Sequence, residues 1–143
     1  MSKQIENAFN YCEQVSKKRA KNFYYAFRTL PVLKRQAIYA IYAFCRYCDD
    51  VTDGNLPTEE KKQILEKIRN SLNHPDLGGD DPLFTALRET ISKFEIPTVY
   101  FDELMNGFEM DLTKTRFEDF EELRHYCYCV ASSVGLICLE IFG

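Results

Sequence analysis

The run Arg46-Tyr47-Cys48-Asp49-Asp50-Val51-Thr52-Asp53 places three carboxylates and a guanidinium at the end of an otherwise apolar, aromatic segment. On a helix, Asp49 and Asp53 are four residues apart and Asp50 and Asp53 are three apart, so their carboxylates project toward one side. Magnesium binds through one or two carboxylates and completes its octahedron with water and phosphate oxygens. We therefore expect Asp49 and Asp53 to bind Mg²⁺ directly against a diphosphate, with Asp50 as an alternate ligand.

Arg46 lies one helical turn before Asp49 and could contact phosphate oxygens through a planar, charge-assisted hydrogen bond. Together, the arginine and the carboxylate-bound cation would neutralise a diphosphate as it leaves. The alternative for the same residues is a solvated helix end with an internal ion pair, and the pattern by itself leaves both open.

Aromatic side chains are concentrated in the two segments that lead to the aspartates. If departure of a diphosphate left an allylic cation, aromatic faces could stabilise it and a dry cavity would protect it from water. An ordinary hydrophobic core is the alternative reading of such a stripe. The residues are Phe23, Tyr24, Tyr25, Phe27, Tyr39, Tyr42, Phe44 and Tyr47.

The composition is that of one globular domain spanning residues 1–143. Hydrophobic residues make up 45% and charged residues 28% of the chain, and the net charge is -4. This charge gives no general attraction to nucleic acid, and Lys17-Lys18-Arg19-Ala20-Lys21 is the only dense basic run. No stretch approaches the roughly 20 apolar residues of a spanning helix. We expect a cytoplasmic protein and leave peripheral membrane contact open.

The six cysteines lie inside helical patterns, so we expect reduced thiols packed as small hydrophobic groups. A zinc site built from Cys45, Cys48, Cys127 and Cys129 is the alternative. It is disfavoured because Cys127 and Cys129 would diverge by about 200° on a helix.

The apolar spacing is helical throughout, which predicts an all-α fold. The segment 134–143 is apolar on most faces, so we expect its packing partners to lie outside this chain. The first predicted elements are a helix from Ile5 to Ser16, an aromatic segment from Asn22 to Leu30, and a central helix with Pro31 in its first turn that continues through Ala37 to Asp49. A charged helix follows from Thr58 to Leu72, then a loop from Asn73 to Pro82 and helices from Leu83 to Phe94 and from Pro97 to Leu112. A linker from Thr113 to Phe117 leads to a last helix from about Phe120.

Four ordered blocks of this sequence resemble the squalene/phytoene synthases, which join two prenyl diphosphates head to head. The resemblance implies the N-terminal half of an isoprenoid-synthase-type helical bundle, and the ending is most similar to the bacterial branch that makes presqualene diphosphate. The blocks are Asn22 to Pro31, Ala40 to Asp53, Gly107 to Leu112 and Tyr126 to Gly135.

The resemblance also implies roles for individual residues. Asp49 and Asp53 match the magnesium-diphosphate motif, and Arg46 matches a substrate-contacting position. Tyr126 matches a tyrosine near the reacting carbons, where a phenol can relay a proton or stabilise a cation. Further matches to substrate-binding positions are Lys21, Asn22 and Phe23 in the phosphate-contacting segment, Tyr42 on the central helix, and Val130, Val134 and Gly135 along the prenyl channel.

By this resemblance, the complete protein is expected to condense two farnesyl diphosphates to presqualene diphosphate with Mg²⁺. Phytoene or dehydrosqualene synthase is the alternative within the family. Family members are about twice as long, and their second aspartate-rich motif has no counterpart here. An alternative of another class is therefore a non-catalytic helical module that binds prenyl lipid or a missing C-terminal half.

Overall fold

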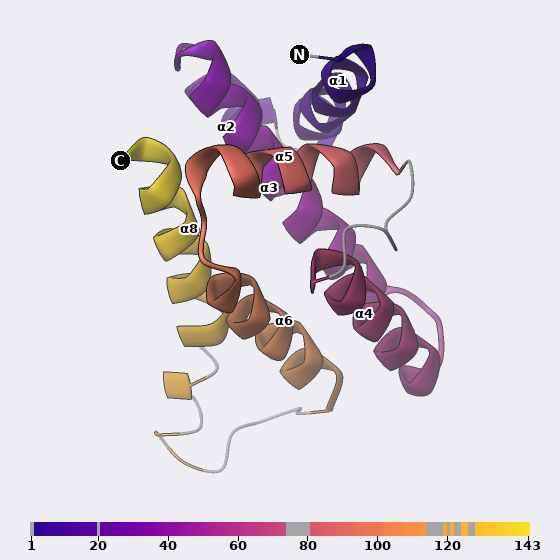
Figure 1. The fold of residues 1–143 in the computed structure, drawn as a ribbon. Coiled ribbons are helices and arrows are strands. Elements are labelled where there is room, and N and C mark those ends of the chain that lie inside the picture. The colour runs from indigo at the N-terminus through magenta and orange to yellow at the C-terminus, as the bar shows by residue number, and fades with distance from the viewer. Residues whose placement is uncertain are drawn as a thin grey trace.

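The computed structural model describes residues 2–19, 21–73, 81–113, 119, 121, 124–125 and 128–143. Every regular element within these ranges is helical, as the apolar spacing predicts (Figure 1). The elements are α1 (Lys3–Arg19), α2 (Lys21–Phe27), α3 (Val32–Asp53), α4 (Thr58–Asn73), α5 (Pro82–Phe94), α6 (Thr98–Thr113), the π-helical turn η2 (Tyr128–Ser132) and α8 (Ser133–Phe142).

Helix α3 is the centre of the fold. It packs against α1, α2, α4, α5, α6 and α8, and its middle part, from Ala37 to Phe44, is largely buried. Its apolar residues surround the helix, so each face finds a neighbouring helix to cover it. The prediction of a central helix from the sequence is confirmed.

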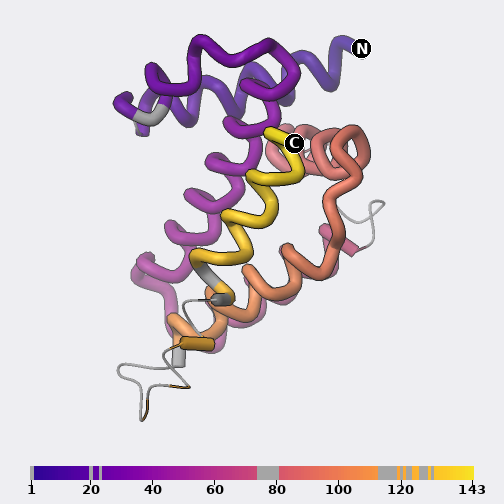
Figure 2. Tube along the Cα trace, turned by 90° about the vertical axis from the view of Figure 1, so that its left-hand side faces the viewer, coloured from indigo at the N-terminus to yellow at the C-terminus, as the bar shows by residue number. Residues whose placement is uncertain are grey.

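Helix α8 runs beside α3 in the opposite direction, which brings the C-terminus back to the start of α3 (Figure 2). There Lys34 Nζ donates a hydrogen bond to the Phe142 carbonyl at 3.2 Å. The rings of Phe27 and Phe142 stack at a centroid distance of 6.2 Å. These contacts hold the ends of α2 and α8 next to the first turn of α3.

The aspartate-bearing end of α3 is tied to the start of α4. Thr52 Oγ1 donates to the Asp49 carbonyl at 3.0 Å, and Lys61 Nζ donates to the Thr52 carbonyl at 2.7 Å. The last carbonyls of a helix lack partners within the helix, so both donors stabilise this end. They fix the backbone from which Asp49 and Asp53 project.

The beginnings of the central helix and of the last helix differ from the prediction. Pro31 precedes α3 in an extended conformation, with φ -51° and ψ 147°, instead of lying in its first turn. The last predicted helix, from about Phe120, lies partly outside the described residues, and where it is described the π-helical turn η2 precedes α8. Helix α8 buries Ser133, Ile137 and Ile141, while Leu139 is 64% exposed.

Candidate active site

An apolar pocket of about 260 Å³ opens between α3, α6 and α8. Helix α3 contributes one face, and α6 and α8 each contribute two side chains four residues apart, which lie on the same side of a helix. The lining residues are Ile38, Ile41, Tyr42, Cys45, Asp49, Leu104, Phe108, Val134 and Cys138. The structure thus brings three residues predicted from sequence, Tyr42, Asp49 and Val134, to one cavity.

Asp49 is the single carboxylate among the described residues that line this pocket. From Ile38 to Asp49 the lining extends eleven residues, or about 16 Å along the helix axis. Hydrophobic side chains occupy the rest of the wall, so the pocket is polar at the Asp49 end and apolar along its length. This is the shape expected for a ligand with a charged head and a hydrocarbon chain.

The electrostatic surroundings of Asp49 suit a hard cation. Burial raises the pKa of Asp49, the Arg46 guanidinium opposes this rise, and the charges of Asp53, Asp111 and Asp50 add to it. Neighbouring negative charges thus disfavour the ionised form of Asp49, which lines the apolar pocket, and a divalent cation with oxygen preference would relieve that repulsion. The donor set fits magnesium, with Asp49 and Asp53 as the residues that would hold it.

Asp111 is a candidate that sequence reasoning missed. It lies in the last turn of α6, and its charge acts on Asp49. The signal was present, because Asp111 belongs to the block from Gly107 to Leu112 that resembles the family. Its effect on Asp49 could not be read from the sequence, since α3 and α6 are separated by two further helices.

Asp50 faces a different hollow from Asp49. Its carboxylate accepts two hydrogen bonds from Arg19 at 3.2 Å and two from Arg46, at 3.1 and 3.2 Å. Burial opposes ionisation, but these hydrogen bonds outweigh it and lower the pKa of Asp50. Asp50, Arg19 and Arg46 line a hollow of about 250 Å³ on the side of α3 that faces α1. The role of Asp50 as an alternate metal ligand stays a prediction.

The basic run at the end of α1 therefore lies beside the aspartate motif. Lys18 and Arg19 line the same hollow as Arg46. The sequence analysis assigned no binding role to Lys18 or Arg19, and the contact of Arg19 with Asp50 across 31 positions was not predicted. Lys21 and Asn22 follow in the first turn of α2 and are exposed.

Two tyrosines fix α2 against α3. The Tyr39 hydroxyl donates to the Tyr24 carbonyl at 2.7 Å, and the two rings stack at a centroid distance of 5.4 Å. Both side chains are buried, so they act as core here. Of the predicted aromatic wall, Tyr42 reaches the apolar pocket.

Several predicted site residues are not located by the structure. Tyr126 lies outside the described residues, and the side chains of Phe23 and Val130 are not described although their backbones lie in α2 and η2. Gly135 is exposed in α8, and a Cβ added there would meet no atom within 4 Å. Their assigned roles stay predictions.

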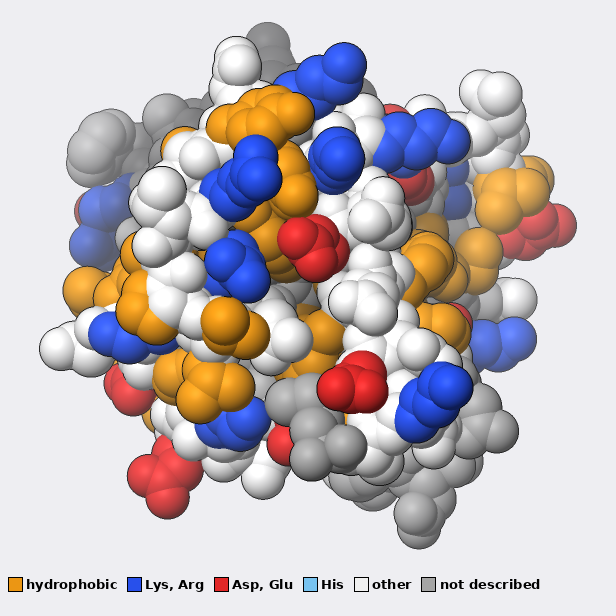
Figure 3. Space-filling view, turned by 90° about the horizontal axis from the view of Figure 1, so that it is seen from above, with side chains coloured by type: hydrophobic (Ala, Val, Ile, Leu, Met, Phe, Trp, Pro, Cys, Tyr) orange, Lys and Arg blue, Asp and Glu red, His pale blue; other side chains and the backbone are white. Residues whose placement is uncertain are grey.

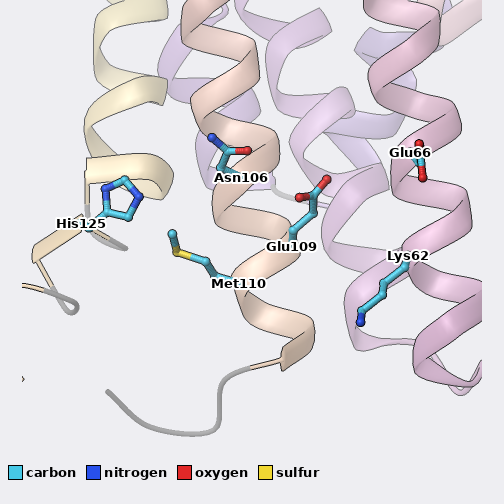
Figure 4. A pocket seen from close by; sticks show the side chains of 6 residues that line it. All are labelled: Lys62, Glu66, Asn106, Glu109, Met110 and His125. Atoms are coloured by element: carbon cyan, nitrogen blue, oxygen red, sulfur yellow. The ribbon is translucent and has the colours of Figure 1, made fainter. Parts of the chain in front are cut away.

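A third, more polar hollow lies between α4, α6 and the segment before η2 (Figure 4). It has a volume of about 460 Å³ and lies away from Asp49; its lining residues are Lys62, Glu66, Asn106, Glu109, Met110 and His125. Arg69 of α4 contacts Asn106 Oδ1 at 2.8 Å and Glu109 Oε1 at 3.1 Å. These contacts hold α4 against α6, which carries Leu104 and Phe108 to the apolar pocket.

The thiols that the structure describes are free. Burial raises the pKa of Cys45 to about 12, with smaller contributions from Asp49 and Cys138. In the described part of the chain, no three His, Cys, Asp or Glu side chains form a group that could hold a metal by themselves. The zinc alternative thus has no support from Cys45, Cys48 and Cys129, and Cys127 lies outside the described residues.

Comparison with known proteins defines the class to which this fold and site belong. The family model for squalene/phytoene synthase matches residues 16–143. A phytoene synthase from Mycobacterium tuberculosis is 41% identical to this chain over 98% of its length. A phytoene synthase from Arthrospira platensis is 34% identical over 96% of it. The chain belongs to the squalene/phytoene synthase family, so the resemblance seen in the sequence is confirmed.

Solved structures agree on the fold. A dehydrosqualene synthase in complex with ligand superposes with a TM-score of 0.82 at 35% identity over 96% of the chain. Squalene synthase HpnC from Alicyclobacillus acidocaldarius gives a TM-score of 0.87 at 28% identity over the whole chain. The predicted isoprenoid-synthase-type helical fold is confirmed. The chain spans 46% of the mycobacterial relative and 48% and 54% of the two solved chains, about half their length.

No helix within the described ranges is both long and apolar enough to cross a membrane.

Proposed function

We propose that this chain forms the Asp49-bearing half of an enzyme that condenses two prenyl diphosphates head to head. The observation that carries the proposal is the pocket between α3, α6 and α8, in which Asp49 ends a wall of apolar side chains. A diphosphate would lie at the carboxylate end, and the prenyl chain would extend along α3 toward Ile38.

The residues of the pocket have separate tasks in this proposal. Asp49 and Asp53 would hold Mg²⁺, which supplies charge neutralisation to the departing diphosphate. Arg46 and the neighbouring Arg19 add positive charge on the other side of α3. Ile41, Leu104 and Phe108, with their neighbours, exclude water from a carbon centre that becomes cationic.

The reaction we propose begins when the C–O bond of one allylic diphosphate breaks and the diphosphate leaves with the electron pair. The double bond of the second prenyl diphosphate attacks the allylic carbon. Loss of a proton then closes a cyclopropane and gives presqualene diphosphate, diphosphate and a proton. Tyr126 is our candidate for receiving that proton or stabilising the cation, by its place in the family block.

Farnesyl diphosphate is the proposed substrate, as the ending of the sequence suggests. The second candidate is phytoene synthesis, and a specific observation favours it: the relatives from Mycobacterium, Arthrospira and Zea mays are named phytoene synthase. The two candidate activities can be distinguished by supplying farnesyl diphosphate and, separately, its homologue that is one isoprenyl unit longer, and by identifying which of them is converted to product.

The test is diphosphate release from farnesyl diphosphate with magnesium, for the purified chain alone and with an added C-terminal half of a relative. We expect release in at least the second case, and we expect Asp49→Ala and Asp53→Ala to abolish it. If neither preparation releases diphosphate while both bind a prenyl lipid, the chain is a non-catalytic lipid-binding module instead.

A further inference from the structure

Positive charge is concentrated in one part of this acidic chain. Residues 16–48 contain eight Lys and Arg residues and no Asp or Glu, although the whole chain has 22 acidic residues and a net charge of -4. Such segregation creates a local positive field on a protein that otherwise repels anions. The eight residues are Lys17, Lys18, Arg19, Lys21, Arg28, Lys34, Arg35 and Arg46.

Exposed apolar side chains lie in the middle of this basic segment. Tyr25 is 53% exposed, Val32 53% and Leu33 49%. They occupy the corner formed by residues 25–35, where α2 ends and α3 begins. Seen from above, the face that carries this region shows many Lys and Arg side chains interspersed with hydrophobic ones and with a few acidic ones (Figure 3). Exposed apolar groups among cations are typical of surfaces that insert into a lipid headgroup region.

The corner is structurally firm. Arg35 donates a hydrogen bond to the Arg28 carbonyl at 3.0 Å, which closes the turn between the two helices. Lys34 contacts the Phe142 carbonyl at the end of α8. Val32 and Leu33 are therefore presented at a fixed position, and little ordering would be required on binding.

The corner also lies at the far end of the apolar pocket from Asp49. Leu33 precedes the lining residue Ile38 by five positions on α3. Phe142, whose ring stacks on Phe27 of α2, follows the lining residue Cys138 by four positions on α8. A prenyl chain whose diphosphate is held at Asp49 would point toward this corner. That relation rests on the proposed function, whereas the charge and exposure of the corner do not.

We propose that the corner of residues 25–35 docks on the surface of an anionic lipid bilayer. Val32, Leu33 and Tyr25 enter the interface, while Arg28 and its basic neighbours contact the lipid phosphates. A second copy of the chain is a poorer occupant, because two identical basic corners would repel each other. Charge complementarity thus selects an anionic bilayer over self-association.

The test is co-sedimentation of the purified chain with vesicles of phosphatidylcholine, with and without phosphatidylglycerol. We expect binding only to the anionic vesicles and a decline as salt is raised. Val32→Glu with Leu33→Glu should weaken binding by at least about tenfold. Val99→Glu is the matched control, because Val99 is 52% exposed near the start of α6, and it should leave binding unchanged. Arg28→Gln should weaken binding about fivefold.

A fluorescence experiment tests the same proposal without the Val32→Glu/Leu33→Glu variant, in case that variant does not fold. The chain contains no tryptophan, so Leu33→Trp and Val99→Trp each introduce a single tryptophan. Emission of the first should shift to the blue with anionic vesicles, and emission of the second should not. The proposal would be overturned if the emission of both tryptophans shifted equally, or if the chain bound equally to both vesicle types. It would also be overturned if Val32→Glu/Leu33→Glu abolished dimerisation of the chain and left vesicle binding unchanged.

Binding of magnesium diphosphate, measured on the same variants, separates this inference from the proposed function. If the docking proposal fails, vesicle binding is absent while diphosphate binding persists. If the proposed function fails, the reverse holds.

Discussion

Asp49 and Asp50 are consecutive on α3, yet their carboxylates lie in different surroundings. Asp49 lines the apolar pocket toward α6 and α8, whereas Asp50 pairs with Arg19 and Arg46 on the side of α1. Successive residues on a helix are rotated by about 100°, which is enough to separate two neighbouring side chains onto different faces. Substitutions of Asp49 and of Asp50 can therefore be compared directly, the first for its effect on ligand binding and the second for its effect on stability.

The first prediction concerns this pair. Asp49→Asn should weaken binding of magnesium diphosphate by at least about tenfold, because a charged oxygen ligand is lost from the mouth of the pocket. Asp50→Asn should cost less than about 1 kcal/mol of unfolding free energy, since its ion pair with Arg19 is exposed. Isothermal titration and urea unfolding measure the two effects. A larger binding defect in Asp50→Asn would show that Asp50 is the ligand.

The second prediction concerns the contact between α4 and α6. Arg69→Ala should destabilise the protein by about 1–2 kcal/mol, because its partly buried guanidinium contacts both Asn106 and Glu109. Lys62→Ala on the same helix is the control; its 3.6 Å ion pair with Glu59 is exposed and should contribute less than about 0.5 kcal/mol. Urea denaturation checks both, and equal effects would contradict the assignment.

The third prediction concerns the thiols. Burial raises the pKa of Cys12 and of Cys45 to about 12, so both remain protonated at neutral pH. Labelling with a disulfide reagent at pH 8 should be at least about a hundredfold slower for these residues in the folded than in the denatured chain. Mass spectrometry of labelled peptides gives the rates, and rapid labelling of Cys45 would contradict the pKa.

The same shift has a consequence for stability. A thiol whose pKa is higher in the folded state contributes stability that is complete below its unfolded pKa, near 9. This contribution is lost progressively as pH rises toward 12. Urea unfolding at increasing alkaline pH should show a decline that is shallower in Cys12→Ala.

The fourth prediction concerns the end of α5. Glu95 is the one described non-glycine residue with positive φ, at 51°, and its amide closes the helix on Ile91 and Ser92. Glycine adopts this conformation without a Cβ penalty, so Glu95→Gly should stabilise the protein by about 0.5–1 kcal/mol. Glu95→Ala removes the same carboxylate but keeps the Cβ, and should give no gain. Thermal unfolding of both variants decides.

The fifth prediction uses two glycines. Gly135→Ala should stabilise α8 by about 0.5–1 kcal/mol, because the added Cβ meets open space. Gly54→Ala should destabilise, since its Cβ would lie 3.0 Å from the Asp50 carbonyl oxygen. If Gly135 lines the prenyl channel, as proposed from the family block, Gly135→Ala should also weaken farnesyl diphosphate binding. Unchanged binding would remove Gly135 from the site.

The sequence by itself determined the helical class, the central position of α3 and the family. These depend on local patterns: apolar residues at helical spacing, proline and glycine at helix ends, and ordered blocks around the aspartates. Asp49, Asp50 and Asp53 were also recognised from their spacing, because the geometry of one helix fixes which side chains project toward one side, and the family resemblance selected Asp49 and Asp53.

Only the tertiary structure decided which helices complete the pocket and which charges meet across the chain. Leu104 and Phe108 join Asp49 because α6 packs beside α3, and Arg19 meets Asp50 because α1 crosses its other side. These contacts join residues far apart in sequence, and their pairing depends on how whole helices bury their apolar faces together. Local spacing therefore predicted the aspartates, whereas packing decided that Asp49 faces a hydrocarbon-lined pocket and Asp50 faces arginines.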